Sequence, residues 1–103
     1  MLQKIKAIIV NRNLVTTLKN NVDFLSKDSR VEVIIFDQQS TYPPPLEYYK
    51  TQNVIYNNSN GGPYSAWGLA ELNRYHYIVT DADCTYHDVP DDWLDKMLYC
   101  LDN

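Results

Sequence analysis

Two aspartates separated by a single residue, Asp81 and Asp83, directly follow the apolar run Tyr77–Thr80. Alternate residues of a strand point the same way, and where a strand gives way to a loop both carboxylates can reach one ligand. Hard divalent cations such as Mg²⁺ or Mn²⁺ prefer oxygen ligands and keep coordination positions open for phosphate oxygens. The pair therefore predicts metal-bridged binding of a diphosphate. The alternative is that these aspartates cap the turn that follows the strand.

The composition indicates one globular domain and excludes several partners. The chain has 103 residues, of which 45% are hydrophobic and 21% charged, and such a chain buries about 65% of its unfolded surface. Its net charge is −4 without a basic block, which argues against nucleic acid as a partner. Because no apolar run approaches membrane-spanning length and no signal peptide follows Met1, we expect a cytoplasmic protein without a transmembrane segment. Cys84 and Cys100 are expected to be free thiols.

Apolar runs and helical periodicity predict strands that alternate with helices. The predicted strands are Ile5–Val10, Val31–Phe36, Val54–Tyr56 and Tyr75–Thr80. Apolar residues at helical spacing predict a first helix between Leu14 and Leu25. The segment Gln38–Pro45 ends in three consecutive prolines and is predicted to be a loop, followed by one helical turn over Leu46–Lys50.

Two more helices are predicted in the second half of the chain. One begins at Pro63 and runs to Leu72, and the last has Asp88 as N-cap, Pro90 at its first position and an apolar face from Trp93 onward. This alternation predicts an α/β fold with a parallel sheet of about four strands and helices on both faces. Ligands of such sheets bind beyond the carboxyl ends of the strands. The polar residues expected there are Asn11, Arg12, Asn13, Asp37, Asn57, Asn58, Asp81 and Asp83.

Four short motifs occur in a fixed order along the chain. They are Ile8–Asn13, an apolar strand ending in polar residues; Phe36–Thr41, with an aspartate before Ser-Thr; the Gly- and Ala-containing stretch Asn60–Gly68; and Asp81-Ala82-Asp83. In this order they resemble the family 2 type of GT-A glycosyltransferases, whose DxD motif the last one matches. The resemblance covers essentially the whole chain. It implies a Rossmann-like nucleotide-sugar-binding domain over residues 1–103.

For the first two strand ends, the resemblance implies contacts with a nucleotide. Asp37 would accept a hydrogen bond from the base, typically uracil, and Asn11 and Arg12 would line the base and the ribose, where the family more often has Thr and Tyr. Other uses of these residues remain open at this point. Asp37 can cap the turn after its strand, and Asn11 or Asn13 can be the N-cap of the first helix.

For the second half of the chain, the resemblance implies a diphosphate site. Gly61 and Gly62 would let the backbone pass close to the donor. Asp81 would contact the ribose or the metal shell, and Asp83 would ligate Mn²⁺ or Mg²⁺ between the two phosphates. The implied function is metal-dependent transfer of a sugar from a nucleotide-diphospho-sugar, typically a UDP-sugar. The cation would stabilise the charge that develops on the leaving diphosphate.

The chain also departs from the family. GT-A catalytic domains are longer, and their acceptor site and catalytic carboxylate have no visible counterpart here. A non-catalytic module that binds a nucleotide or nucleotide sugar is therefore the alternative, and we expect either a homodimer or a missing C-terminal half, since the strand bearing the DxD lies near a sheet edge. Asp81-Ala82-Asp83-Cys84-Thr85 also fits the DxDxT pattern of haloacid-dehalogenase-like phosphatases, but only 18 residues follow Thr85, too few for that family's other elements.

Overall fold

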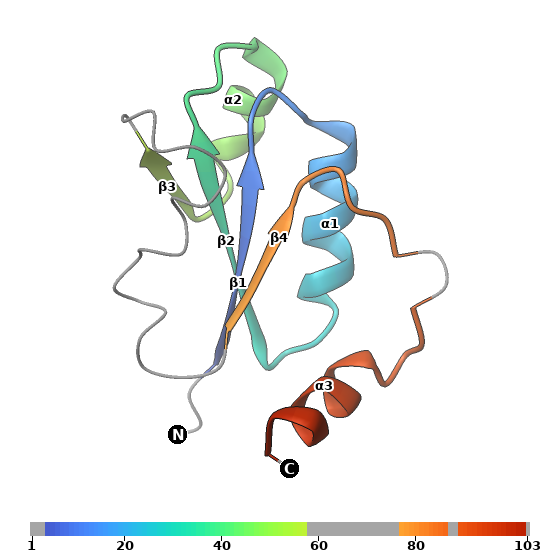
Figure 1. The fold of residues 1–103 in the computed structure, drawn as a ribbon. Coiled ribbons are helices and arrows are strands. Elements are labelled where there is room, and N and C mark those ends of the chain that lie inside the picture. The colour runs from blue at the N-terminus through green and yellow to red at the C-terminus, as the bar shows by residue number, and fades with distance from the viewer. Residues whose placement is uncertain (1–3, 58–76, 87–88, 103) are drawn as a thin grey trace.

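Four parallel strands and three helices make up the part of the chain that the computed structural model describes, residues 4–57, 77–86 and 89–102. Along the chain (Figure 1) they are β1 (Ile5–Asn11), α1 (Thr16–Ser26), β2 (Val31–Gln38), α2 (Pro43–Tyr49), β3 (Val54–Asn57), β4 (Tyr77–Asp81) and α3 (Trp93–Asp102). The strands form one sheet in the order β3-β2-β1-β4, and every neighbouring pair is parallel. The predicted α/β class and its parallel four-stranded sheet are confirmed.

The larger hydrophobic core lies on one face of this sheet. Alternate residues of β1, among them Ala7 and Ile9, point to this face and are fully buried. All three described helices contribute to the same core, with Leu18 from α1, Tyr49 from α2 and Leu94 from α3. A smaller buried cluster on the other face consists of Ile8, Ile34 and Phe36. The helix predicted from Pro63 to Leu72 lies outside the described residues.

Two helix starts differ from the predictions. The prolines assigned to a loop form the first turn of α2, which begins at Pro43. The first N–H groups of a helix have no intrahelical acceptor, so prolines cost little there, and Tyr42 before them is extended with ψ 127°. Pro90 was predicted as the first residue of the last helix, but α3 begins only at Trp93. A turn precedes the helix, in which the Trp93 N–H donates to the Pro90 carbonyl at 3.1 Å. Asp88, its predicted N-cap, lies outside the described residues.

All four strands extend further than predicted at their carboxyl ends. β1 continues to Asn11, β2 to Gln38, β3 to Asn57 and β4 to Asp81. Polar residues expected in loops are therefore held in the sheet ladder, where their backbone positions are fixed by pairing. No helix within the described ranges is long and apolar enough to cross a membrane.

Candidate functional site

The strand register brings several of the predicted site residues to one edge of the sheet. Asn11 of β1 is level with Asp37 of β2, and Asp81 of β4 is level with Val10 on the other side of β1. The chain adds β2 and β3 on one side of β1 and then places β4 on the opposite side. The carboxyl ends of β1 and β4 therefore flank the topological switch point, where open α/β sheets bind their ligands.

Asp37 is almost fully buried, with 4% of its surface exposed. Its Oδ1 accepts the Tyr49 hydroxyl at 2.7 Å, and the Ser40 N–H lies 3.3 Å from Oδ1 and 3.2 Å from Oδ2. Asn11 completes this cluster, because its Nδ2 donates to the Tyr49 oxygen at 2.8 Å and to the Leu14 carbonyl at 3.0 Å. Asp37 thus caps the turn after β2, the alternative use that the sequence left open.

Tyr49 is central to this cluster and was not predicted. Burial raises the pKa of the Tyr49 hydroxyl to about 12, opposed by hydrogen bonds from Ser40 and Asn11. The phenol therefore stays protonated at neutral pH and remains a donor to Asp37. Asn11 is 1% exposed, and its Oδ1 is buried without a partner among the described residues. That oxygen can accept one more hydrogen bond from a ligand or from water.

Asn13 ties the loops after β1 and β2 together. Its Oδ1 accepts the N–H groups of Thr41 and Tyr42 at 2.7 and 2.8 Å, and its own N–H donates to the Ser40 hydroxyl at 2.9 Å. Its φ of 62° is in the left-handed region that asparagine tolerates best after glycine. The N-cap position of α1 is Val15, without a side-chain capping bond. Neither Asn11 nor Asn13 is therefore the N-cap of α1, the alternative use that the sequence left open for them. Arg12 between them is exposed.

Asp81 and Asp83 lie on either side of a buried residue, Ala82. Ala82 is 2% exposed and its N–H donates to the Val10 carbonyl at 3.0 Å, while the Cys84 N–H closes the turn onto the Asp81 carbonyl at 3.3 Å. Both aspartates are exposed. Among the described residues no group of three or more His, Cys, Asp and Glu side chains is placed to hold a metal. The pair offers hard oxygen ligands and leaves the other positions of a cation for phosphate and water.

At the two ends of this edge, the polar side chains lie on opposite faces of the sheet. Because side chains alternate along a strand, Asp37 shares the face of Ile35, which packs in the larger core, and Asn11 shares that of Ile9. Asp81 shares the opposite face with Val79 of the smaller cluster. A ligand that contacts both ends must cross the tips of the strands.

A second buried polar residue, Asn21 of α1, holds the turn that carries Asp83. It is 0% exposed, and its amide contacts the Ala82 and Cys84 carbonyls and the Tyr86 hydroxyl. Neither Asn21 nor Tyr86 was predicted as a functional residue. The sequence does contain a signal, because Asn21 stands in the stripe of helical spacing formed by Leu18, Val22 and Leu25, where a polar residue needs a buried partner.

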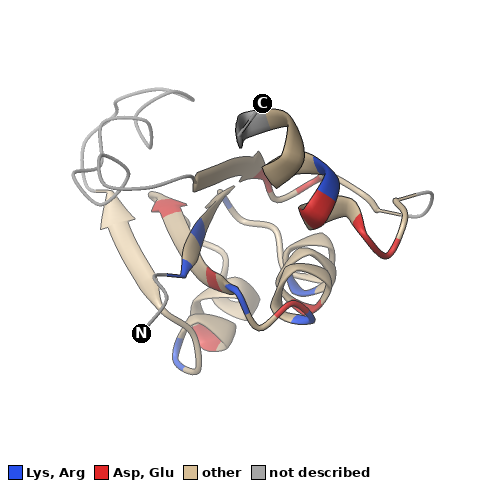
Figure 2. Cartoon of the chain, turned by 90° about the horizontal axis from the view of Figure 1, so that it is seen from below, with Lys and Arg blue, Asp and Glu red and all other residues tan. Residues whose placement is uncertain are grey.

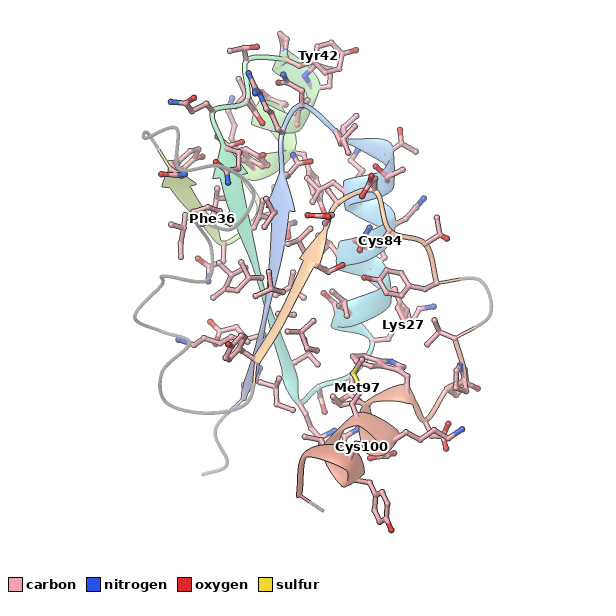
Figure 3. All side chains as sticks on the ribbon, in the orientation of Figure 1. Lys27, Phe36, Tyr42, Cys84, Met97 and Cys100 are labelled. Atoms are coloured by element: carbon pink, nitrogen blue, oxygen red, sulfur yellow. The ribbon has the colours of Figure 1, made fainter. Side chains whose placement is uncertain are left out.

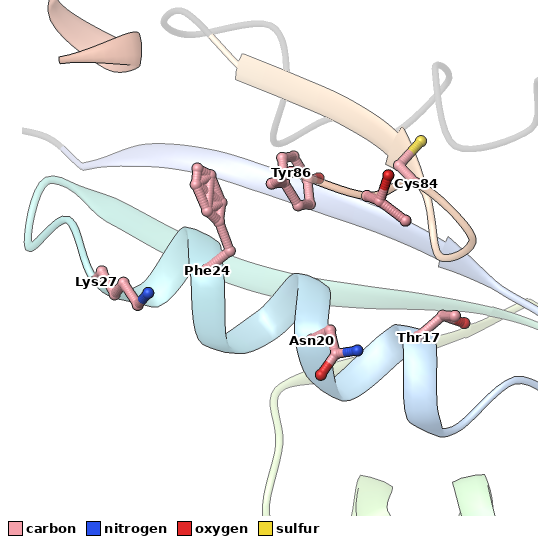
Figure 4. A pocket seen from close by; sticks show the side chains of 7 residues that line it. Thr17, Asn20, Phe24, Lys27, Cys84 and Tyr86 are labelled. Carbon is pink, nitrogen blue, oxygen red and sulfur yellow. The ribbon is translucent and has the colours of Figure 1, made fainter. Parts of the chain in front are cut away.

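A hollow of about 250 Å³ lies next to this turn, on the side of α1. Figure 4 shows its lining, with the Phe24 ring of α1 directed toward Tyr86 in the segment after β4. The lining does not include Asp81 or Asp83, so the hollow is distinct from the predicted metal site. Cys84 and Cys100 are free, as predicted, and both are exposed; Figure 3 shows them well apart. The predicted donor-site residues Gly61 and Gly62 lie outside the described residues.

Comparison of the chain with models of protein families, with curated proteins and with solved structures finds no match. The class that the fold itself defines is an α/β protein with an all-parallel sheet. A more specific function has to be argued from the residues at the carboxyl edge.

Proposed function

We propose that this chain binds a nucleotide-diphospho-sugar, typically a UDP-sugar, with Mn²⁺ or Mg²⁺, and acts as a GT-A glycosyltransferase of the family 2 type. The observation that supports this most is the position of Asp81 at the switch point of the sheet, beside the end of β1. Asp83 follows it in an exposed turn. The DxD resemblance and the location favoured for ligands in open parallel sheets therefore coincide.

In this proposal the two aspartates hold the diphosphate end of the donor. Asp83 is the main ligand of the cation, and Asp81 contacts the metal shell or the ribose. The cation, when bound, stabilises the negative charge that develops on the leaving nucleoside diphosphate. Arg12, exposed at the end of β1, lines the ribose and adds a positive charge on the other side of the switch point.

The base lies at the Asp37 end of the edge. Oδ1 of Asp37 accepts the Tyr49 hydroxyl, whereas Oδ2 receives, among the described residues, the Ser40 N–H alone at 3.2 Å. Oδ2 is therefore the atom of this carboxylate with capacity to accept an N–H from a base. Oδ1 of Asn11, which has no partner within the described part of the chain, is a second acceptor in the same cluster.

One observation favours a non-catalytic binding module as the second candidate. Asp95 of α3 is remote from the proposed site, because it is bound to Arg30, immediately before β2 begins. In Figure 1, α3 lies near the starts of the strands, whereas β4 ends at the opposite edge of the sheet. Asp95 therefore supplies no general base at the carboxyl edge.

Calorimetric titration with UDP, with and without Mn²⁺, tests the binding proposal. We expect wild-type protein to bind UDP with Mn²⁺, and the affinity to fall at least about tenfold without the metal or in Asp83→Ala, because a ligand of the cation is lost. Asp91→Ala, which changes another exposed aspartate in the turn before α3, is the matched control and should bind as wild type does. Binding that is indifferent to both Mn²⁺ and Asp83 would refute the metal bridge.

An assay of sugar release from UDP-sugars then separates the two candidates. Turnover that Asp83→Ala abolishes supports a glycosyltransferase. Metal-dependent binding of UDP without turnover supports the binding module.

A further inference from the structure

Asn21 is a fully buried side chain whose hydrogen bonds converge on one turn of the chain. Its Nδ2 lies 3.0 Å from the Thr17 carbonyl, 3.0 Å from the Ala82 carbonyl and 2.9 Å from the Cys84 carbonyl. Its Oδ1 accepts the Tyr86 hydroxyl at 2.6 Å. Since a buried amide that loses its partners is costly, this arrangement strongly favours one position of the turn.

Two of the three carbonyls that Asn21 binds belong to the residues on either side of Asp83. The turn's own bond, from the Cys84 N–H to the Asp81 carbonyl, is long at 3.3 Å. Both aspartates are exposed, so packing of their side chains contributes little order. The Ala82 N–H is bound to the Val10 carbonyl at 3.0 Å, and the contacts that Asn21 makes with the Ala82 and Cys84 carbonyls hold the backbone on both sides of Asp83.

Tyr86 supports Asn21 from the far side. Its ring stacks on Phe24 of α1 with centroids 4.2 Å apart, as Figure 4 also shows. Burial raises the pKa of its hydroxyl, which a hydrogen bond with Thr80 opposes. The phenol is therefore protonated at neutral pH, and it donates to Oδ1 and leaves Nδ2 facing the two carbonyls.

We infer that Asn21 is a positioning residue that orders the Asp81–Cys84 turn and thereby sets the geometry of the two carboxylates for a metal-bound diphosphate. The second part of this inference, the effect on the metal site, rests on the proposed function. A turn ordered before binding loses less conformational freedom when the cation and phosphates arrive, and this raises their affinity.

The first test is Asn21→Asp, which keeps the side-chain shape and replaces the NH₂ donor with a carboxylate oxygen. That oxygen faces three carbonyl oxygens and repels them. We expect the Cys84 amide to exchange with solvent at least about tenfold faster relative to the amides of β1, measured by NMR. We also expect the affinity for UDP with Mn²⁺ to fall at least about tenfold, the effect typical of losing a residue that supports a metal ligand.

The matched control is Asn20→Asp, which makes the same chemical change at the neighbouring, exposed position of α1. It should leave both readouts at their wild-type values. Tyr86→Phe is the second test, because it keeps the ring stacked on Phe24 and removes only the hydroxyl. We expect a loss of affinity of about fivefold, since one hydrogen bond to Asn21 is removed. This variant decides the matter if Asn21→Asp does not fold.

The outcomes distinguish this inference from the proposed function. If wild-type protein does not bind UDP with Mn²⁺, the proposed function fails, and amide exchange alone decides whether Asn21 orders the turn. The inference is overturned if, in both variants, the exchange rate of the Cys84 amide relative to the β1 amides stays at its wild-type value. It is also overturned if wild-type protein binds UDP with Mn²⁺ and the variants bind it with the same affinity although their Cys84 amide exchanges faster.

Discussion

At the scale of single residues, buried polar side chains stabilise the loops at the carboxyl edge. Asn11, Asn21 and Asp37 are each at most 4% exposed, and Asn11 and Asp37 share Tyr49 as a partner. Each of these groups lost its hydrogen bonds to water on folding. The folded state is therefore destabilised if such a group also loses its partner in the protein. Tyr49 is the residue whose loss affects two of them at once.

Tyr49→Phe tests this cluster. The change removes the hydroxyl between Asn11 and Asp37 while preserving the ring, and each of these two buried groups loses one hydrogen bond. We expect the free energy of unfolding to fall by about 1–3 kcal/mol, measured by urea denaturation. Tyr42→Phe, at an exposed position of 51% accessibility, should change it by less than about 0.5 kcal/mol. Equal stabilities of the two variants would contradict the role of Tyr49.

At the scale of elements, Arg30 connects the turn after α1 to α3. Its guanidinium contacts the Asp28 carboxylate at 2.7 Å and the Asp95 carboxylate at 2.8 Å. The hydrogen bond from Arg30 is the main cause that lowers the pKa of Asp28 to about 2. Figure 2 shows the described Lys and Arg residues distributed over strands, loops and helices rather than gathered in a stripe.

The lowered pKa of Asp28 predicts a loss of stability in acid. Because its folded pKa is lowered, its contribution is complete above the unfolded pKa of about 3.9 and is lost as the pH falls through about 2. The group is partly exposed, so we expect about 1 kcal/mol or less. Urea denaturation of wild type and Asp28→Asn at pH 7, 4 and 2 measures it, and the difference between them should shrink toward pH 2. Asp23→Asn on α1 is the control, and a difference independent of pH would contradict the prediction.

The elements were largely predictable from the sequence, and the contacts between them were not. Buried parallel strands appear as apolar runs, so Ile5–Val10 and Val31–Phe36 were found within two residues of their ends. The start of α2 was missed because prolines that break a helix interior are tolerated in its first turn. The roles of Tyr49 and Asn21 depend on partners 38 and 61 residues away, and no local pattern reports such distant contacts.

At the scale of the whole molecule, β4, which ends at Asp81, is an edge strand of the described sheet. In the described sheet β4 pairs only with β1, and β3 is the other edge strand. An edge strand presents backbone groups that can pair with another chain unless they are covered. Tyr77, the first residue of β4, is 39% exposed.

We expect β4 to pair with β4 of a second copy, giving a concentration-dependent dimer. Sedimentation velocity over a range of protein concentrations measures it. Tyr77→Lys adds a charge to this edge and should shift the equilibrium toward monomer. Tyr99→Lys on α3, where the side chain is 69% exposed, makes the same change away from the edge and should not. A monomer at every concentration would refute the pairing.

The carboxyl edge has two separate supports, and this bears on how such a protein can change over evolutionary time. α2 holds the Asp37 end through Tyr49, and α1 holds the Asp83 end through Asn21. Among the described residues these two supports share no hydrogen-bond partner, so substitutions in them should act additively. Drift in α2 can therefore remodel one end of the edge while the other stays intact, so that the two ends can diverge at different rates.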